Sequence, residues 1–208
     1  MGTRVLAVLA GGTPSFQPIG ELRHGCDLVF AADSGQDVCL RYGFRPDVVV
    51  GDLDSVSERL AGVDYRERRD QDFSDCDKLL GEISLMGDVD LVMAGLEGDR
   101  FDHVLSSLGS IVRSGLNPRI LLQQGIGEIV RAGRSLSLER WANREFSVIG
   151  LGEATVSTLG AKWEMSRTHV SYESGFSLSN VGALDNVEVT VHIGVALVIL
   201  DGGVVSWE

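Results

Sequence analysis

Hydrophobic residues follow two different patterns along the chain, and the pattern changes near Gly125. Before it, short continuous apolar runs alternate with segments in which apolar residues recur at helical spacing. The continuous runs are Val5 to Leu9, Leu28 to Ala32, Val48 to Val50, Leu91 to Ala94 and Ile120 to Leu122. A run that is apolar at every position indicates a strand buried on both faces, as in a parallel sheet between helix layers. The first part of the chain is therefore predicted to be an α/β domain with an open, mostly parallel sheet.

Two helices are predicted between these strands from the spacing of apolar residues. Residues that share a face are Leu79, Leu80, Ile83 and Met86 in one helix, and Val104, Leu108, Ile111 and Val112 in the other. Ser74 with Asp77 three residues later is typical of a helix start. Gly115 ahead of Asn117-Pro118 is typical of a helix end. The order strand, helix, strand, helix supports the α/β interpretation.

After about Gly125, apolar and polar residues alternate strictly, with glycine-rich breaks between the alternating stretches. The stretches are Ser135 to Leu138, Phe146 to Val148, Val187 to Ile193 and Val195 to Ile199. Period two with turn residues at short intervals is typical of an antiparallel β-sandwich, and no helix is predicted here. We therefore predict two domains, an α/β domain over residues 1–130 and an all-β sandwich over residues 131–208. The boundary is expected between Gly125 and Asn143.

Composition and charge exclude several classes of function. A chain of 208 residues that is 44% hydrophobic can bury a full core, and a net charge of −12 argues against binding to DNA or RNA. The N-terminal apolar run is too short for a secretory signal, and no later run reaches the roughly 18 residues of a membrane span. We expect a soluble, cytoplasmic protein without nucleic-acid or membrane partners. Three cysteines without a C-x-x-C pair indicate neither a disulfide framework nor a zinc site.

Aspartates are concentrated in the first part of the chain, where they follow the predicted strands. Of the 17 aspartates, 15 lie before position 126. Ligands of open α/β sheets bind at the carboxyl ends of the strands. The segments that follow strands, or that open the next helix, are Asp33-Ser34-Gly35, Gly51 to Ser55, Asp70 to Lys78 and Gly95 to His103. Four carboxylate-bearing loops are thus expected to converge on one edge of the sheet.

Such a cluster of carboxylates predicts a cation site. Neighbouring carboxylates repel one another unless a cation lies among them, and Mg²⁺ prefers oxygen ligands of this kind. In Asp52-Leu53-Asp54, an extended chain would direct both carboxylates to one side and turn Leu53 into the core. The segment is therefore a candidate for holding a metal ion together with a nucleotide.

Two basic residues near the acidic loops are candidates for binding phosphate. Lys78 lies in the first turn of one predicted helix, and Arg100 lies at the start of the next. Helix N-termini favour anions because their backbone N–H groups are unpaired. The simpler alternatives are that Lys78 is a solvated helix residue and that Arg100 pairs with Asp99 or Asp102.

Together, these residues resemble the motifs of the thiamine pyrophosphokinase family. The matching segments are Asp33-Ser34-Gly35, Pro46-Asp47 through Ser55, Ser74-Asp75 with Lys78, Gly98 through His103, Gly160-Ala161-Lys162-Trp163 and Ser179-Asn180. Their order and spacing agree with the family, and they span nearly the whole chain. The sequence departs from the commonest pattern at Leu53, where Phe is usual, at Ser34 and Gln36 in the first turn, and at Asp99, where Gly is frequent. None of these departures removes a carboxylate or the arginine.

The resemblance implies an activity and an assembly. The α/β domain would bind ATP, and the sandwich would supply part of a thiamine site in a homodimer whose active sites lie between subunits. The reaction would transfer diphosphate from ATP to the thiamine hydroxyl, giving thiamine diphosphate and AMP, with Mg²⁺ as cofactor.

The resemblance also implies roles for individual residues. The metal ligands would come from Asp33, Asp52, Asp54, Asp75 and Asp102. The nucleotide would be bound by Asp33, Ser34, Lys78 and Arg100. The catalytic set would be Asp52, Asp54, Asp75, Lys78, Arg100 and Asp102. Trp163 would stack on a thiamine ring, whose polar edge would be bound by Ser179 and Asn180, helped by Gln71.

Three alternatives stay open at this point. The same fold and chemistry could serve a pterin alcohol as acceptor, or the chain could be a non-catalytic regulator that binds thiamine or a nucleotide. The intact acidic segments and both basic residues argue against a regulator. Trp163 could also be a core aromatic residue of the sandwich. The histidines His103, His169 and His192 are interpreted as structural.

Overall fold

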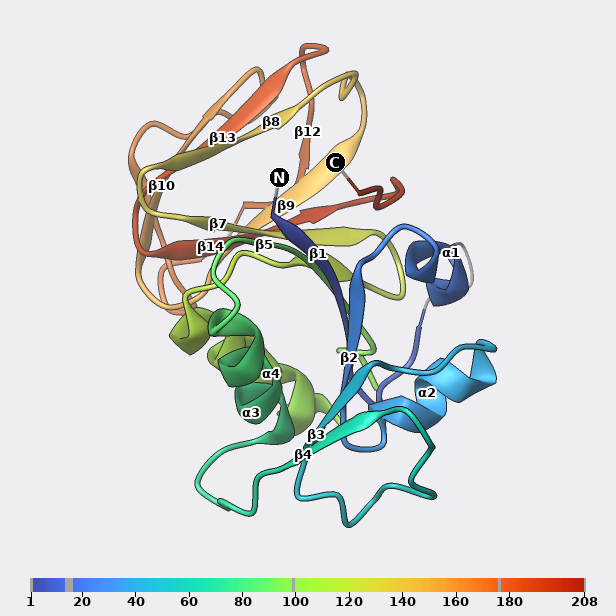
Figure 1. The fold of residues 1–208 in the computed structure, drawn as a ribbon. Coiled ribbons are helices and arrows are strands. Elements are labelled where there is room, and N and C mark those ends of the chain that lie inside the picture. Colours follow the sequence, from blue (N-terminus) through green and yellow to red (C-terminus); the bar gives the residue numbers. More distant parts are fainter. Residues whose placement is uncertain (1, 14–16, 99, 176, 208) are drawn as a thin grey trace. The chain divides into compact units, whose positions relative to one another are not determined.

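The structure, a computed structural model, describes residues 2–13, 17–98, 100–175 and 177–207 (Figure 1). The chain divides into two compact units. Unit 1 comprises Met1–Gln124 together with Val204–Glu208, and unit 2 comprises Gly125–Gly203. Among the helices of the described residues, none has the length and apolar character needed to cross a membrane.

The described residues of unit 1 form six parallel strands. They are β1 (Thr3–Val8), β2 (Leu28–Ala32), β3 (Val48–Gly51), β4 (Asp64–Glu67), β5 (Val89–Ala94) and β6 (Arg119–Leu121). They lie in the order β6-β5-β1-β2-β3-β4, and all neighbouring pairs are parallel. In the central strand β1, Val5 lies opposite Leu28 on one side and Leu91 on the other. The predicted open parallel sheet is confirmed.

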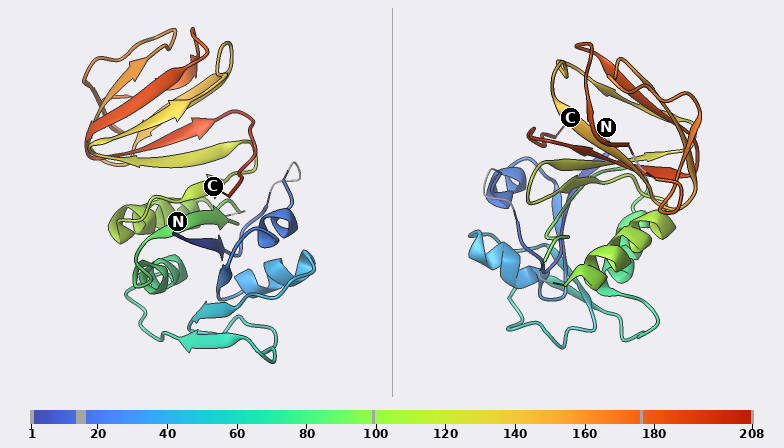
Figure 2. Two further views of the ribbon diagram at one scale, coloured as in Figure 1. Left: turned by 45° about the horizontal axis from the view of Figure 1, so that its top comes forward. Right: turned by 180° about the vertical axis from the view of Figure 1, so that it is seen from behind.

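In the part of unit 1 that the structure describes, four helices cover the two faces of this sheet. They are α1 (Ile19–Arg23), α2 (Gly35–Arg41), α3 (Asp75–Ser84) and α4 (Phe101–Ser114). Helices α3 and α4 lie on one face and α1 and α2 on the other, and the views in Figures 1 and 2 agree on this arrangement. Helix layers on both faces explain why β1, β2, β3 and β5 each contain a continuous apolar run.

The ends of α3 and α4 follow from their sequences. At the start of α3, the Ser74 hydroxyl accepts the N–H of Asp77 at 3.1 Å, and the Asp77 carboxylate accepts the N–H of Ser74 at 3.1 Å. This reciprocal pair satisfies two N–H groups that the helix leaves unpaired. Helix α4 ends at Gly115, which has a left-handed φ of 76°. Both predicted helix termini are confirmed.

The last residues of the chain return to unit 1 and pack beside α1. The buried Gln17 side chain forms two hydrogen bonds with Val205, donating to its carbonyl at 2.6 Å and accepting its N–H at 2.9 Å. The Trp207 indole N–H donates to the Leu22 carbonyl at 2.9 Å. A Cβ added to Gly25 would lie 2.2 Å from the Trp207 ring, so only glycine fits there. Unit 1 is thus completed by residues from both ends of the chain.

Unit 2 is an antiparallel β-sandwich. Its strands are β7 (Ile126–Arg131), β8 (Arg134–Leu138), β9 (Glu145–Gly150), β10 (Ala154–Leu159), β11 (Thr168–Val170), β12 (Ser177–Val181), β13 (Val187–Ile193) and β14 (Val195–Leu200). The strands lie in the orders β12-β9-β14-β7 and β11-β10-β13-β8, and the paired strands are antiparallel. The part of residues 125–203 that the structure describes contains no helix. The predicted all-β fold is confirmed.

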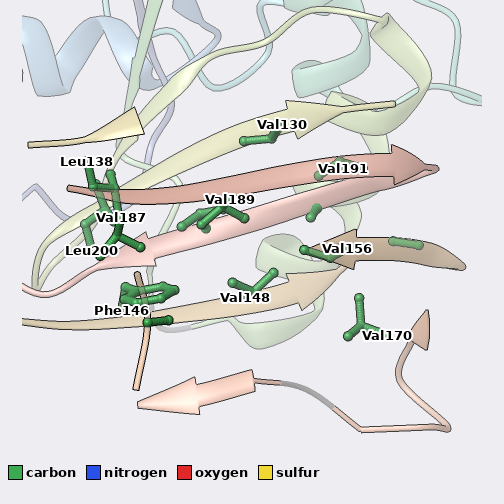
Figure 3. Packing of buried hydrophobic residues seen from close by; sticks show 14 of the residues in the cluster. Val130, Leu138, Phe146, Val148, Val156, Val170, Val187, Val189, Val191 and Leu200 are labelled. Atoms are coloured by element: carbon green, nitrogen blue, oxygen red, sulfur yellow. The ribbon is translucent and has the colours of Figure 1, made fainter. Parts of the chain in front are cut away.

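Alternate residues of these strands form one hydrophobic core. Val187, Val189 and Val191 of β13 are buried together with Phe146 and Val148 of β9 (Figure 3). The residues between them on β13 are more exposed, as the strict alternation predicts. The first strand of the unit, β7, pairs along its length with β14. This pairing places the start of unit 2 at Gly125, earlier than the expected division after residue 130.

Candidate active site

A pocket of about 580 Å³ lies in unit 1 at the carboxyl ends of its strands, beside the starts of α3 and α4. Seven of the residues assigned to the site from the sequence line it, namely Asp33, Ser34, Asp52, Gln71, Asp75, Lys78 and Arg100. These residues come from segments that are far apart in the chain, namely loops that follow different strands and the first turn of α3. Their convergence agrees with the general position of ligand sites in open α/β sheets.

One wall of the pocket is formed by two glycine-containing loops that lie against each other. Beyond the strand ends, the N–H of Leu9 donates to Ala94 at 2.8 Å, and the N–H of Gly11 donates to Gly95 at 2.9 Å. A Cβ on Gly11 would lie 2.3 Å from the Glu97 carbonyl oxygen, and Gly95 has a φ of 75°. The close approach therefore requires glycine at both positions.

Three carboxylates form a cluster in this unit. One carboxylate oxygen each from Asp33, Asp52 and Asp54 lies within 4.8 Å of the other two. Asp33 is 5% exposed, and none of the described residues provides a hydrogen bond to its buried Oδ1. Burial, together with the negative charge of Asp75 nearby, raises the pKa of Asp33 above its ordinary value. A buried, unpaired carboxylate oxygen beside two further carboxylates fits a divalent cation such as Mg²⁺.

The turn at Leu53, and not an extended strand, brings Asp52 and Asp54 together. Leu53 has a left-handed φ of 65° and is only half-buried, so the interpretation of an extended chain with Leu53 in the core was wrong. Asp52 accepts the N–H of Asp54 at 3.3 Å, and this backbone bond lowers the pKa of Asp52. The Ser55 hydroxyl donates to Asp54 at 2.9 Å. The expected convergence of the two carboxylates holds, but its cause is a tight turn.

Lys78 is a buried cation on the pocket wall. Its side chain is 6% exposed, and its ammonium group donates to Asp75 at 3.1 Å. The alternative of a solvated helix lysine is therefore wrong. Asp75 lies outside the three-carboxylate cluster and acts here as the partner of Lys78. A lysine held in this way offers a positive charge to a ligand in the pocket.

Arg100 lines the pocket and pairs with Asp102. Its Nε donates to Asp102 at 3.1 Å in a two-pronged ion pair whose side chains are both mostly exposed. Hydrogen bonding from Arg100 lowers the pKa of Asp102 to about 2. The sequence analysis considered an ion pair of Arg100 with Asp99 or with Asp102, and the structure shows the pair with Asp102. Asp99 lies outside the described residues. Asp102 is not part of the carboxylate cluster.

Further pocket residues were not assigned from the sequence. They include Phe73, Cys76, His103, Ser106 and Ser107. Phe73 is 53% exposed and directly precedes the N-cap Ser74 of α3, where an apolar residue commonly packs on the fifth residue after it. The fifth residue after Phe73 is Lys78. The pairing of an apolar residue with a lysine at these two positions was the sequence signal that could have identified Phe73 as a pocket residue. Burial raises the pKa of Cys76 to about 12, so its thiol stays protonated at neutral pH and is a poor nucleophile.

The thiamine residues expected in unit 2 differ in exposure. Trp163 is 56% exposed and lines a second pocket of about 380 Å³ with Met165 and Leu178. The alternative that Trp163 is a core residue is therefore wrong. Ser179 is exposed and has a left-handed φ of 50°, whereas Asn180 is 1% exposed. Gln71, in unit 1, lies near the cluster, with its amide 3.4 Å from Asp52.

The three histidines that were interpreted as structural, His103, His169 and His192, are not alike. His103 lines the pocket of unit 1, so its position fits a functional role as well as a structural one. His169 pairs with Glu153 at 2.8 Å, and His192 forms a hydrogen bond with Ser157 at 2.8 Å. Both pairs lie in unit 2, and their contacts agree with the structural interpretation.

Comparison with known proteins points to one family. The family model described as "Thiamin pyrophosphokinase, catalytic domain" matches residues 19–122, half of the chain. The chain is 26% identical over 186 residues to "Thiamine pyrophosphokinase 1" of Oryza sativa subsp. japonica, covering 80% of this chain and 69% of the relative. It is 24% identical over 223 residues to "Thiamine pyrophosphokinase 1" of Arabidopsis thaliana, covering 90% and 83%.

Solved structures show the same fold. The thiamin pyrophosphokinase from Geobacillus thermodenitrificans superposes with a TM-score of 0.80 at 18% identity, covering 97% of this chain and 98% of that one. The thiamin pyrophosphokinase from Candida albicans gives a TM-score of 0.79 at 16% identity, covering 96% and 90%. The matched residues 19–122 run from α1 to the end of β6, so they include the whole carboxylate cluster.

Proposed function

Because this chain belongs to the thiamin pyrophosphokinase family, we propose that it transfers a diphosphate group from ATP to the hydroxyl group of thiamine. The observation that carries the proposal is the pocket of unit 1, which is lined by two of the three clustered carboxylates and by the buried ammonium group of Lys78. A divalent cation and a fixed lysine are the two kinds of positive charge that a transferring phosphoryl group requires.

We assign Mg²⁺ to the cluster of Asp33, Asp52 and Asp54. When bound, the ion would neutralise part of the charge of the triphosphate. The unpaired Oδ1 of Asp33 supports this assignment, because a buried carboxylate oxygen without a donor is otherwise unfavourable. For Asp75 and Asp102, which lie outside the cluster, a metal role stays a prediction. Their ion pairs with Lys78 and Arg100 favour a different role, which is to orient these two cations.

In the proposed reaction, the hydroxyl oxygen of thiamine attacks the β-phosphorus of ATP in line with the leaving group. A bond forms between this oxygen and the β-phosphorus, and the bond from the β-phosphorus to the oxygen shared with the α-phosphorus breaks. AMP leaves with the shared oxygen, and a carboxylate of the cluster takes the hydroxyl proton. Lys78 and Arg100 would bind non-bridging oxygens, and Ser34 would contact the nucleotide. Such transfers depend mainly on positioning and charge neutralisation.

We assign binding of the thiamine ring to Trp163, with Ser179 and Gln71 at its polar edge. The exposure of Trp163 and the pocket beside it support this assignment, because a stacking partner must present its ring to the ligand. Asn180 belongs to the same set from the resemblance, and its role is treated below.

The proposal includes a homodimer in the cytoplasm. Unit 2 exposes several large apolar side chains, including Leu159, Leu178, Leu184 and Ile193, which a second copy of the chain would cover. Cys26, Cys39 and Cys76 are free and buried, which suits a reducing compartment where ATP is available.

Phosphorus NMR of the reaction products tests the proposed function. With ATP, Mg²⁺ and thiamine, we expect AMP and thiamine diphosphate in equal amounts. Formation of ADP and thiamine monophosphate would contradict the reaction type. Parallel samples with a pterin alcohol, or without any acceptor, separate the remaining alternatives. AMP formation only with the pterin would change the acceptor, and thiamine binding without turnover would indicate a regulator.

A further inference from the structure

The side chain of Asn180 is fully used in holding the backbone around Trp163. Its Oδ1 accepts the N–H groups of Trp163 at 3.2 Å and of Val181 at 2.9 Å. Its Nδ2 donates to the Trp163 carbonyl at 2.8 Å and to the Ser177 hydroxyl at 3.1 Å. An asparagine side chain offers two acceptor sites and two donor hydrogens. All four are occupied, and the residue is 1% exposed, so no capacity is left for a substrate.

A bulge in strand β12 directs Asn180 inward. Ser177 lies opposite Val148 of β9, whereas Asn180 lies opposite Phe146, so two residues of β12 face a single residue of β9. Of these two, Ser179 has a left-handed φ of 50° and donates its N–H to the Ser147 hydroxyl at 3.0 Å. This conformation is unfavourable for a non-glycine residue, so the bulge is maintained by its surroundings. Bulges commonly redirect a side chain beside a functional site.

The rest of the segment that carries Trp163 is also fixed. The N–H of Lys162 donates to Val181 at 2.7 Å, and the N–H of Met165 donates to the Thr158 hydroxyl at 2.9 Å. The Lys162 ammonium group lies 4.6 Å from the centre of the Trp163 ring. The backbone around Trp163 is therefore fixed by hydrogen bonds of Lys162, Met165 and Trp163 itself, while 56% of the surface of Trp163 is accessible.

We propose that Asn180 is a positioning residue that holds Trp163 as a rigid platform for a flat ring of the substrate, without touching the substrate itself. The identification of that ring as one of thiamine rests on the proposed function. A platform that is already ordered before binding does not lose conformational entropy when the ligand arrives, which improves affinity. The bulge at Ser179 and the four hydrogen bonds of Asn180 supply this order.

Three variants test the proposal. Asn180→Ala removes all four hydrogen bonds. Asn180→Asp has nearly the same shape and keeps both acceptor contacts, but it loses both donors. Val189→Ala is the control, because Val189 is fully buried in the core of unit 2 and its side chain makes none of the hydrogen bonds that hold the segment around Trp163. Calorimetric titration with thiamine and with ATP and Mg²⁺, together with KM and kcat for each substrate, gives the readouts.

We expect Asn180→Ala to weaken thiamine binding about tenfold and to raise the KM for thiamine, with ATP binding unchanged. Asn180→Asp should weaken thiamine binding at least as much as Asn180→Ala, because its buried carboxylate would face the Trp163 carbonyl without a donor. Val189→Ala should lower the melting temperature without changing either affinity. Thiamine affinity in Asn180→Ala equal to that of the wild type would overturn the proposal. Equal loss of ATP and thiamine binding would do the same. If Asn180→Ala does not fold, Asn180→Asp decides by the same measurements.

Hydrogen exchange of the Trp163 amide separates this proposal from the proposed function, because it needs no substrate. Faster exchange in Asn180→Ala or Asn180→Asp, but not in Val189→Ala, supports the positioning role even if the wild type binds no thiamine. Unchanged exchange in both Asn180 variants overturns it, whatever the enzyme does. Failure of the wild type to bind thiamine contradicts the proposed function alone.

Discussion

Replacing Asp33 by asparagine should stabilise the ligand-free protein and remove its response to metal. Asp33 is the buried member of the carboxylate cluster, and its Oδ1 lacks a donor among the described residues. Without a cation, its negative charge is repelled by Asp52 and Asp54. An amide of the same shape carries no charge and can donate hydrogen bonds to the two remaining carboxylates.

The size of the effect follows from the separation of the carboxylates. At 4.8 Å, two unit charges repel by about 1 kcal/mol at the dielectric constant of water and by about 3 kcal/mol at an effective value of about 20. Asp54 is exposed and Asp52 is half-buried, so the lower part of this range applies. We expect Asp33→Asn to stabilise the free protein by about 1 to 2 kcal/mol. For a chain of this length, that corresponds to a rise in melting temperature of roughly 2 to 8 °C.

Differential scanning calorimetry with and without Mg²⁺ and a non-hydrolysable ATP analogue measures both effects. The wild type should gain stability from the ligands, and Asp33→Asn should not. Asp185→Asn is the matched control, because Asp185 is exposed in unit 2 and the substitution removes the same charge. It should leave both melting temperatures nearly unchanged.

The pH dependence gives an additional check on the reasoning. A carboxyl group whose pKa is raised in the folded state destabilises the fold when it is ionised, and this effect disappears as the pH falls through the raised pKa. The advantage of Asp33→Asn should therefore be full above the raised pKa of Asp33 and should shrink as the pH is lowered from there toward 3.8, the ordinary value for Asp. A lower melting temperature of the free variant would refute the repulsion argument. An undiminished response to Mg²⁺ and nucleotide would refute the metal role.

Three further predictions concern other parts of the molecule. Asp54→Asn should preserve the fold but reduce kcat by at least about a hundredfold, since single electrostatic groups contribute several kcal/mol to catalysis; near-normal AMP release by the folded variant would contradict its role. Trp163→Ala should weaken thiamine binding about tenfold with little change in melting temperature, because the indole is exposed; titration calorimetry with thiamine and ATP checks this, and unchanged thiamine affinity would exclude stacking. Burial raises the pKa of Glu82, but hydrogen bonds from Arg66 and Arg68 outweigh burial, and the pKa is lowered overall. The contribution of Glu82 to stability should therefore be full above about pH 4.5 and should be lost as the pH falls below that value. Urea unfolding from pH 7 to pH 3 should show a smaller decrease for Glu82→Gln than for the wild type, and equal slopes would contradict the ion-pair argument.

The apolar pattern predicted the strands that are buried on both faces, because such strands are apolar at successive positions. Each residue of β1 from Val5 to Val8 is buried, and the sequence there is apolar at every position. Strand β4 was not predicted, because Asp64 to Glu67 is polar and mostly accessible. It is stabilised by pairing with β3 and by the ion pair between Arg66 and Glu82, which lie far apart in the sequence. Such long-range pairing leaves no local signal.

The site was predictable where it depends on strand ends and unpredictable where it depends on local turns. Asp33 and Asp52 follow buried strands, so their convergence follows from the general geometry of parallel sheets. The left-handed turn at Leu53 has no sequence signal, because leucine disfavours that conformation. The resemblance implied that Asn180 binds the polar edge of the thiamine ring, whereas its hydrogen bonds in the structure join it to Trp163, 17 positions away. The sequence does not show which groups a side-chain amide binds, because its partners are brought together only by folding. For Asn180, these partners are groups of the same chain.

The return of the chain end to unit 1 has a consequence for synthesis of the protein on the ribosome. Residues 1–124 contain every residue that lines the pocket of unit 1, yet the partners of Gln17 and Leu22 are Val205 and Trp207, which are translated only after unit 2. Until then, the buried amide of Gln17 lacks its two backbone partners, and the surface above Gly25 lacks the Trp207 ring. Domains usually fold in the order of their synthesis, but here the first unit is completed only after the second has been made. A truncation that removes residues 204–207 would therefore damage the structure around α1, because Trp207 lies 185 positions after its partner Leu22.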